Sequence, residues 1–307
     1  RVKIMIDNTA FNHALEERFK EINARIAGYL PEEKGCQKTI FEAMNYSMNA
    51  GGKRLRPLLM QEVCRLFTGE VSEIVKPFMA AIEMIHTSSL VHDDLPCMDD
   101  DMIRRGKAST WAEYGEDIGV LAGDALMMYA FETASKAFDA AEDADALLRA
   151  GKAMGILAAK TGVYGMIGGQ TVDVELAGGP VPKDKLDFIY RLKTGALLQA
   201  AMLIGAVLGG AADEDCKIVE DLAGKVGLAF QIQDDILDVT GDASVTGKAA
   251  GSDEKNQKTT YVTLEGLSKA RKEVEALSAA AIGDLDKLPG NNEFLEQLIR
   301  LLVNRER

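Results

Sequence analysis

Carboxylates crowd into one stretch of the sequence, residues 85–110, which reads IHTSSLVHDDLPCMDDDMIRRGKAST. An apolar segment ends in Asp93 and Asp94, and Asp99 to Asp101 follow shortly after. Like charges so close together repel one another unless a cation lies among them. Mg²⁺ takes oxygen ligands and often bridges carboxylates to phosphate oxygens, and the arginines that follow suit bidentate binding of phosphate. The alternative is a solvated acidic loop followed by a basic helix start.

A second acidic cluster lies far along the chain, in FQIQDDILDVTGD at 230–242. Asp234 and Asp238 are four residues apart and share one face of the expected helix. Carboxylates at this spacing destabilise a helix unless a cation joins them. Two inward-facing clusters on facing helices would hold metal ions and a diphosphate between them.

Cationic residues accompany both clusters. The stretch GGKRLRP at 51–57 places a tight glycine turn and three cations at a helix start, which is a natural anion site, although a helix corner with solvated cations is the alternative. Lys193 lies within a Leu- and Ala-rich helix, where a lysine either meets an anion or extends to the surface. Lys248 and Lys258 lie in a polar, Gly-rich loop, 241–260, which suits a lid or a plain disordered loop.

Composition favours one large all-helical domain over residues 1–307, although length alone suggests about two domains. The chain is 47% hydrophobic and has only 7 prolines, while alternating β-branched runs are scarce. The pattern predicts helices over 7–30, 39–48, 58–67, 78–92, 115–140, 146–177, 184–210, 213–240, 261–278 and 292–305.

Charge and cysteine content exclude several classes of function. The net charge of −13 argues against nucleic acid as a partner. Four cysteines without paired spacing and three histidines give zinc little support, and free thiols suit a reducing cytoplasm. The most apolar run, 200–212, is shorter than the ~18 residues of a spanning helix, so no membrane span is expected.

Five motifs occur in one order across nearly the whole chain: GGKRLRP at 51–57, HDDLPCMDDDMIRRGK at 92–107, GMIGGQTVD at 165–173, Lys193-Thr194-Gly195, and FQIQDDILD at 230–238. Together they resemble the trans-isoprenyl diphosphate synthases of the polyprenyl synthetase family. The resemblance implies an all-α, isoprenoid synthase-type bundle around a deep central cavity, usually as a homodimer. It also implies Mg²⁺-dependent, head-to-tail condensation of an allylic diphosphate with isopentenyl diphosphate, with three Mg²⁺ ions per active site.

The resemblance also assigns roles to individual residues. It implies that Asp93, Asp99 and Asp234 bind Mg²⁺ with Asp94, Asp235 and Asp238 in direct or water-mediated support, and that Asp93, Asp94, Asp99, Arg104, Lys193 and Asp234 are the catalytic set. The allylic substrate would be held by Arg104, Lys193, Thr194, Gln231, Lys248 and Lys258. Isopentenyl diphosphate would be held by Lys53, Arg56, His86 and Arg105.

Product length is expected to depend on Ser88 and Ser89, one helical turn before Asp93. In bacterial farnesyl synthases an aromatic residue commonly lies five positions before the first aspartate and closes the cavity. The small Ser88 therefore resembles the geranylgeranyl type and predicts a C20 product, with C15 as the alternative. Larger residues deeper in the cavity would then form its floor, for example Ile85, Ile82, Met127 or Phe131.

Three other functions are compatible with part of the pattern. A class I terpene cyclase also ionises a diphosphate, but it does not need the basic turn at 51–57 or Arg105. A non-catalytic partner subunit of a synthase is expected to lose one aspartate cluster, and both are present. A Ca²⁺-binding protein would explain neither Lys193 nor the basic turn, and no EF-hand spacing occurs.

Overall fold

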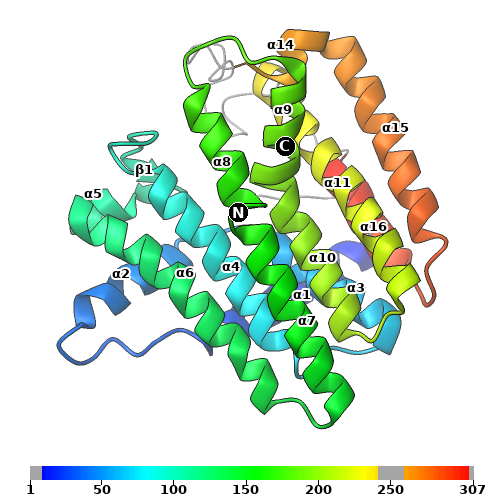
Figure 1. The fold of residues 1–307 in the computed structure, drawn as a ribbon, viewed down its shortest axis with the longest axis horizontal. Coiled ribbons are helices and arrows are strands. Elements are labelled where there is room, and N and C mark those ends of the chain that lie inside the picture. Colours follow the sequence, from blue (N-terminus) through cyan, green and yellow to red (C-terminus); the bar gives the residue numbers. More distant parts are fainter. Residues whose placement is uncertain (1–8, 241–258, 304–307) are drawn as a thin grey trace.

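The computed structural model describes residues 9–240 and 259–303, and within these ranges helices dominate (Figure 1). The all-helical prediction is therefore confirmed. Lys248 and Lys258 lie outside the described residues, and the single domain over 1–307 stays a prediction. The helices are α1 (Thr9–Ala27), α2 (Lys38–Asn49), α3 (Leu55–Thr68), α4 (Val75–Asp93), α5 (Thr110–Tyr114), α6 (Glu116–Asp139), α7 (Ala144–Thr161), α8 (Met166–Glu175), α9 (Lys183–Ile189), the π-helical turn η1 (Tyr190–Gly195), α10 (Ala196–Leu208), α11 (Asp213–Thr240), α14 (Tyr261–Glu265), α15 (Leu267–Leu285) and α16 (Glu293–Val303).

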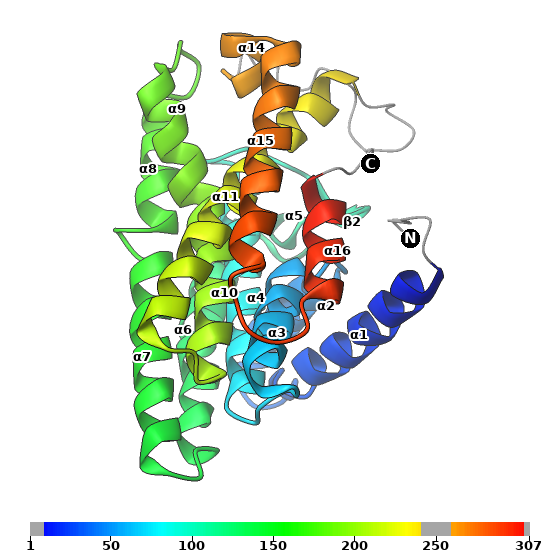
Figure 2. The ribbon, with the colours of Figure 1, turned by 90° about the vertical axis from the view of Figure 1, so that its right-hand side faces the viewer.

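Helix α4 is buried in the interior and delivers the first aspartate cluster at its C-terminal end. It packs against α3, α6 and α10, while α11 packs against α10 and α15 (Figures 1 and 2). Ile82 and Ile85 of α4 and Leu126 of α6 are fully buried where these helices meet. Burial of such side chains is the main favourable term in folding, so the core itself holds the end of α4 in place.

Glycines divide two of the predicted helical stretches. The predicted helix 146–177 ends at Thr161 and restarts at Met166. A Cβ at Gly165 would lie 1.9 Å from the Lys160 carbonyl oxygen, so this corner requires glycine. The predicted helix 261–278 is divided at Gly266, whose φ of 82° is favourable only for glycine.

A small antiparallel hairpin of β1 (Ile103–Arg104) and β2 (Lys107–Ala108) follows the first acidic cluster. Its two turn residues, Arg105 and Gly106, have φ of 54° and 77°. Positive φ at both central positions is the type I′ geometry that joins strands tightly. The alternative of a basic helix start after the acidic loop is therefore wrong, because the chain reverses here.

Helices α9, η1 and α10 form one continuous helical stretch, Lys183–Leu208, of 26 residues. By length and composition alone this stretch could cross a membrane, so the argument from the short run at 200–212 is insufficient. However, 72% of its most apolar window is buried inside the structure, which is typical of a core helix. The irregular η1 turn within it carries Lys193 and Thr194.

Candidate active site

The C-terminal end of α4 and the loop after it arrange the first acidic cluster. The loop curls back over the helix end, because the Asp99 N–H donates to the Asp93 carbonyl at 2.9 Å and the Asp101 N–H to the Asp94 carbonyl at 3.1 Å. The clustering of Asp93 and Asp99 predicted from the sequence is thus built into the backbone. Asp93 is half-buried, Asp99 is exposed and Asp94 is buried.

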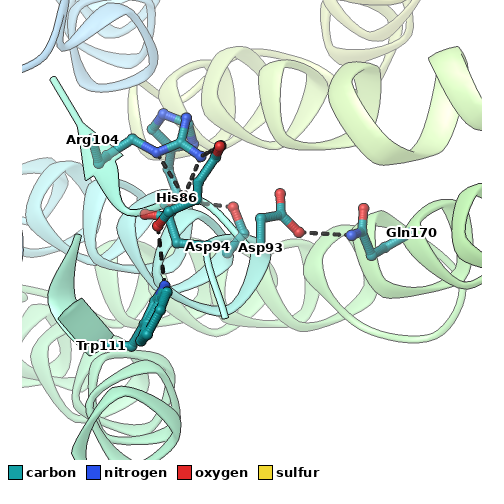
Figure 3. A network of polar contacts seen from close by, with 8 residues as sticks. His86, Asp93, Asp94, Arg104, Trp111 and Gln170 are labelled. Carbon is teal, nitrogen blue, oxygen red and sulfur yellow. Dashed lines mark hydrogen bonds and ion pairs between the residues drawn. The ribbon is translucent and has the colours of Figure 1, made fainter. Parts of the chain in front are cut away.

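Asp93 lies where several polar groups converge (Figure 3). Gln170 of α8 donates to Asp93 Oδ1 at 2.6 Å. Burial raises the pKa of Asp93, with the field of Asp99 adding to this and the cations Lys193 and Arg104 opposing it. The carboxylate is therefore held ready for a cation by a site that partly desolvates it.

Asp94 has a different environment from Asp93. Its carboxylate accepts from Arg104 Nε at 2.8 Å and also from Arg104 Nη2, so the hairpin strand β1 is tied to the end of α4 (Figure 3). The same guanidinium reaches Asp101 at 3.2 Å. This pair orients Arg104 beside Asp93, which lies in its field.

Lys193 in η1 faces the first acidic cluster. Its Nζ is 2.6 Å from Asp173 Oδ2 of α8. Burial alone would lower the pKa of Lys193, but the neighbouring Asp173 and Asp93 carboxylates raise it above its usual value. The lysine is therefore protonated at neutral pH. A Cβ at Gly169 would lie 2.3 Å from the Lys193 backbone nitrogen, so the glycine-rich start of α8 permits this close approach.

The second acidic cluster lies on α11, against the same η1 turn. Thr194 Oγ1 and Gln231 Oε1 are 2.8 Å apart, and Gln231 is one turn before the half-buried Asp234. Asp238, also half-buried, follows one turn later, whereas Asp235 is buried. Because η1 contacts both α8 and α11, it links the two acidic clusters through Lys193 on one side and Thr194 on the other.

A separate group of cations surrounds the start of α3. The Arg105 guanidinium donates to the Gly51 carbonyl, and a Cβ at Gly52 would lie 2.9 Å from it. The hairpin therefore packs directly on the basic turn. Burial lowers the pKa of Arg56 to about 10, with Glu83 opposing and Arg105 adding to the shift, and Arg56 Nε is buried without a hydrogen-bond partner.

His86 lies amid these cations. Its pKa is well below its usual value, first because of burial and then because of the positive charges of Arg56, Arg105, Arg54 and Arg104. The imidazole is therefore neutral at physiological pH. So many cations around one half-buried neutral ring, together with the unpartnered Arg56 Nε, form an environment suited to a phosphate group.

The fit of Mg²⁺ can be judged from the donor set. Within residues 9–240 and 259–303, no group of three or more His, Cys, Asp or Glu side chains is placed to hold a metal ion. Mg²⁺ usually binds through one or two carboxylates together with substrate phosphates. Asp93 and Asp99, which lie close enough for the charge of Asp99 to raise the pKa of Asp93, supply oxygen donors of that kind. The residues present fit Mg²⁺ bound together with a phosphate ligand, not Mg²⁺ in a preformed protein cage.

The residues expected to set product length lie inside the helix packing. Ser88 is fully buried and its Oγ donates to the Ile85 carbonyl at 2.9 Å, while the Ser89 Oγ donates to the His86 carbonyl at 2.8 Å. A small cavity of about 20 Å³, lined in part by Thr87 and Leu90, lies on the side of α4 that faces α2, and is large enough for one water molecule. The deep central cavity stays a prediction.

For two further residues the sequence leaves open whether they line a cavity or make structural polar contacts. Gln170 and Asp173, three residues apart in GMIGGQTVD, contact Asp93 and Lys193 directly. Their spacing on one helix face shows only that they share a surface. The glycines before them, which allow α8 to approach η1, were the signal that this surface meets another helix.

Comparisons with known proteins agree with this geometry. A family model described as Polyprenyl synthetase matches residues 37–299. The heterodimeric geranylgeranyl pyrophosphate synthase large subunit 1 of Arabidopsis thaliana is 45% identical over 79% of this chain and 65% of its own length, so the chain spans about two thirds of that relative. The farnesyl diphosphate synthase of Geobacillus stearothermophilus is 37% identical over 95% of this chain and 97% of its own. The crystal structure of a Helicobacter pylori geranyltransferase, complexed with magnesium and isoprenyl diphosphate, is similar with a TM-score of 0.81, 30% identity and 98% coverage of each chain.

Proposed function

The chain belongs to the polyprenyl synthetase family, and we propose that it joins isopentenyl diphosphate head to tail to allylic diphosphates and releases a short-chain prenyl diphosphate. One observation carries the proposal: η1 links both acidic clusters, while the hairpin links the end of α4 to a second, mainly cationic group. Two anion sites on the two sides of one helix end suit two diphosphate substrates. A terpene cyclase, with a single diphosphate, has no use for the second site.

The allylic diphosphate is held between the acidic clusters by Lys193, Thr194, Gln231 and Arg104. Mg²⁺, when bound to Asp93, Asp99 and Asp234, supplies positive charge for the diphosphate. The C–O bond of the allylic substrate breaks, and the diphosphate leaves with the electron pair. The protonated Lys193 stabilises the charge that develops on it, and such preorganised charges commonly contribute the largest part of catalysis.

Isopentenyl diphosphate is held by Lys53, Arg56, His86 and Arg105. Its π bond attacks the allylic cation, forming the new C–C bond, and the released diphosphate takes the proton that then leaves. The neutral His86 donates a hydrogen bond to the diphosphate and no side-chain base is required. Buried helices around Ile82 and Ile85 exclude water, which would otherwise quench the cation.

The test is a product assay. The protein is incubated with Mg²⁺, isopentenyl diphosphate and, separately, C5, C10 and C15 allylic diphosphates, and chain lengths are read by mass spectrometry. A C20 product from all three primers is the expected result. An unextended C15 primer would retain the enzyme class and make this a C15 synthase. No condensation with any primer would reject the catalytic proposal and favour the non-catalytic partner subunit.

Substitution of Ser88 with tyrosine is expected to shorten the product from C20 to C15. Ser88 lies on α4 above the buried Ile85, so a phenol at this position would fill the path of a growing chain. The measurement is the product distribution with the C10 primer. Ser88→Ala is the control and should leave the C20 product unchanged. An unchanged chain length in Ser88→Tyr would contradict this path for the chain.

We also propose a homodimer formed through α6. Val120, Leu121 and Met128 of α6 are exposed by 39%, 54% and 69%, although the helix is otherwise packed on α4. A second copy would cover this apolar face. Sedimentation should give twice the chain mass, and Leu121→Glu combined with Met128→Glu should give the monomer. A monomeric wild-type protein would reject the proposal.

The cytoplasmic location rests on the cysteines. All four, Cys36, Cys64, Cys97 and Cys216, are free thiols in the structure. The Arabidopsis relative is named chloroplastic, which is a statement about that protein. The location in the cytoplasm stays a proposal, as do the number of Mg²⁺ ions and the absence of nucleic-acid partners.

A further inference from the structure

The second aspartate of the α11 cluster, Asp235, accepts hydrogen bonds from two other residues of the protein. It is only 3% exposed. A single carboxylate oxygen, Oδ2, accepts from the Tyr190 hydroxyl at 2.5 Å and from the Tyr261 backbone N–H at 2.8 Å. The Tyr261 N–H is also 3.3 Å from the Tyr190 hydroxyl oxygen. Three elements, α11, η1 and α14, therefore meet at one buried oxygen.

Tyr190 is the first residue of η1, the turn that carries Lys193 and Thr194. A π-helical turn is rare, and it occurs mostly as a single turn within an α-helix. Its exact shape therefore depends on tertiary contacts at both ends. At the far end, a Cβ on Gly227 of α11 would lie 3.0 Å from the Gly195 Cα, so the backbones touch. At the near end, the Tyr190 hydroxyl donates to Asp235 of α11.

The first acidic cluster shows the same division between its paired aspartates. Asp94 is buried and bound by Arg104, whereas Asp93 is half-buried beside Lys193. On α11, Asp235 is buried and bound by Tyr190, whereas Asp234 is half-buried. In both pairs the first aspartate is half-buried at the site, and the second is buried and binds a side chain of a neighbouring element.

We propose that Asp235 is a positioning residue, which sets Lys193 and Thr194 against the allylic diphosphate through the Tyr190 hydroxyl, and does not ligate metal. The proposal rests on the proposed function for the identity of the ligand. It explains why a tyrosine, with a hydroxyl that donates to Asp235, lies at position 190, where the aromatic ring is part of the core. Loss of the bond frees the near end of η1, so the allylic side of the site loses its geometry and the isopentenyl side does not.

The test compares Tyr190→Phe with Tyr261→Phe. Tyr190→Phe removes the hydroxyl that donates to Asp235. Tyr261→Phe removes the hydroxyl of a second tyrosine but keeps the backbone N–H that donates to Asp235. Tyr190→Phe is expected to raise KM for the allylic diphosphate about tenfold, as for a lost hydrogen bond to a charged group. Its KM for isopentenyl diphosphate and its Mg²⁺ requirement should be unchanged, and Tyr261→Phe should match wild type. Equal changes in both KM values in Tyr190→Phe would overturn the proposal.

Asp235→Asn separates positioning from metal binding. The asparagine oxygen can accept from both donors as Oδ2 does, so its Mg²⁺ concentration for half-maximal activity should stay within about threefold of wild type. Asp234→Asn should raise that concentration strongly. A Mg²⁺ requirement in Asp235→Asn as high as in Asp234→Asn would make Asp235 a ligand and overturn the proposal.

A binding measurement without turnover keeps this inference separate from the proposed function. Calorimetric titration with inorganic pyrophosphate and Mg²⁺ should show weaker binding to Tyr190→Phe than to wild type and Tyr261→Phe. If Tyr190→Phe binds pyrophosphate more weakly but the wild type shows no condensation activity, the proposed function is rejected and the positioning role is kept. Identical pyrophosphate binding by all three proteins would overturn the positioning role even if the wild type is active.

Discussion

Replacing Asp93 with asparagine is expected to lower kcat by about 10³-fold, the loss that removal of one preorganised electrostatic group from an active site typically causes. Asp93 lies between Gln170, at 2.6 Å, and the field of Lys193 and Arg104. An amide keeps the size of the side chain but removes the charge that would hold Mg²⁺ beside the diphosphate. Steady-state kinetics at saturating concentrations of both substrates, with Mg²⁺ titrated, gives the effect.

Stability should change in the opposite direction to activity. Burial raises the pKa of Asp93 in the folded protein above its value in the unfolded chain. Such a shift means that ionisation of Asp93 disfavours the folded state at every pH above the unfolded pKa, neutral pH included. Asp93→Asn removes that charge, so the midpoint of thermal unfolding without ligand should be equal to or above that of wild type.

Asp100→Asn is the matched control for Asp93→Asn. Asp100 belongs to the same loop but is exposed, and its φ of 53° is a conformation that asparagine adopts readily. Its activity should stay within about twofold of wild type. Less than a tenfold loss of kcat in Asp93→Asn, or an equal loss in both variants, would show that the carboxylate at the end of α4 is not the central group of the site.

How far the sequence predicts the structure depends on whether the information is local. Helix α11 runs over Asp213–Thr240 as predicted, because its amphipathic repeat is long and uninterrupted. The position of the break at Gly165 was not predicted, because the glycine-rich run at 146–177 is compatible with either close helix packing or a kink. The π-helical form of η1 was not predicted either, because the same residues satisfy an α-helical pattern and only tertiary contacts distinguish the two.

The site follows the same rule. Both aspartate clusters and Lys193 are recognisable from their types and spacing, and η1 brings Lys193 close to Asp93 of the first cluster. The individual roles of Asp94 and Asp235 are not recognisable in this way, because their partners Arg104 and Tyr190 come from other elements. An Asp-Asp pair in the sequence shows two adjacent carboxylates, but it does not show which of them is buried.

A large loss of stability is expected on substitution of Glu83, a buried carboxylate of α4 that balances the positive charge of the basic turn at 51–57. Glu83 of α4 is 1% exposed and accepts from Arg54 Nη1 at 2.7 Å, and Arg54 is itself 5% exposed. Arg54 also donates to the Met48 carbonyl at 2.5 Å and lies at φ 44° at the start of α3. The pair therefore fixes the backbone that presents Lys53 and Arg56.

Glu83→Gln is expected to reduce the free energy of unfolding by about 3–5 kcal/mol, because removal of one partner leaves a buried charge uncompensated. Glu83 also opposes the burial that lowers the pKa values of Arg56 and Arg105. Without it, three arginines repel one another around the neutral His86. Urea unfolding followed by circular dichroism measures the change, and the exposed Glu73→Gln, which breaks a surface pair with Lys76, should stay within about 0.5 kcal/mol.

An added anion distinguishes this electrostatic explanation from a simple loss of packing. Inorganic pyrophosphate bound by Lys53, Arg56 and Arg105 supplies, close to Arg54, the negative charge that Glu83→Gln lacks. It should therefore stabilise Glu83→Gln more than it stabilises wild type, and the difference should shrink at high salt, because screening weakens such interactions. Equal stabilisation of both proteins, or a loss below about 1 kcal/mol without pyrophosphate, would show that the carboxylate does not balance these arginines. In that case the cationic site would be held by packing of α3 on α4 alone.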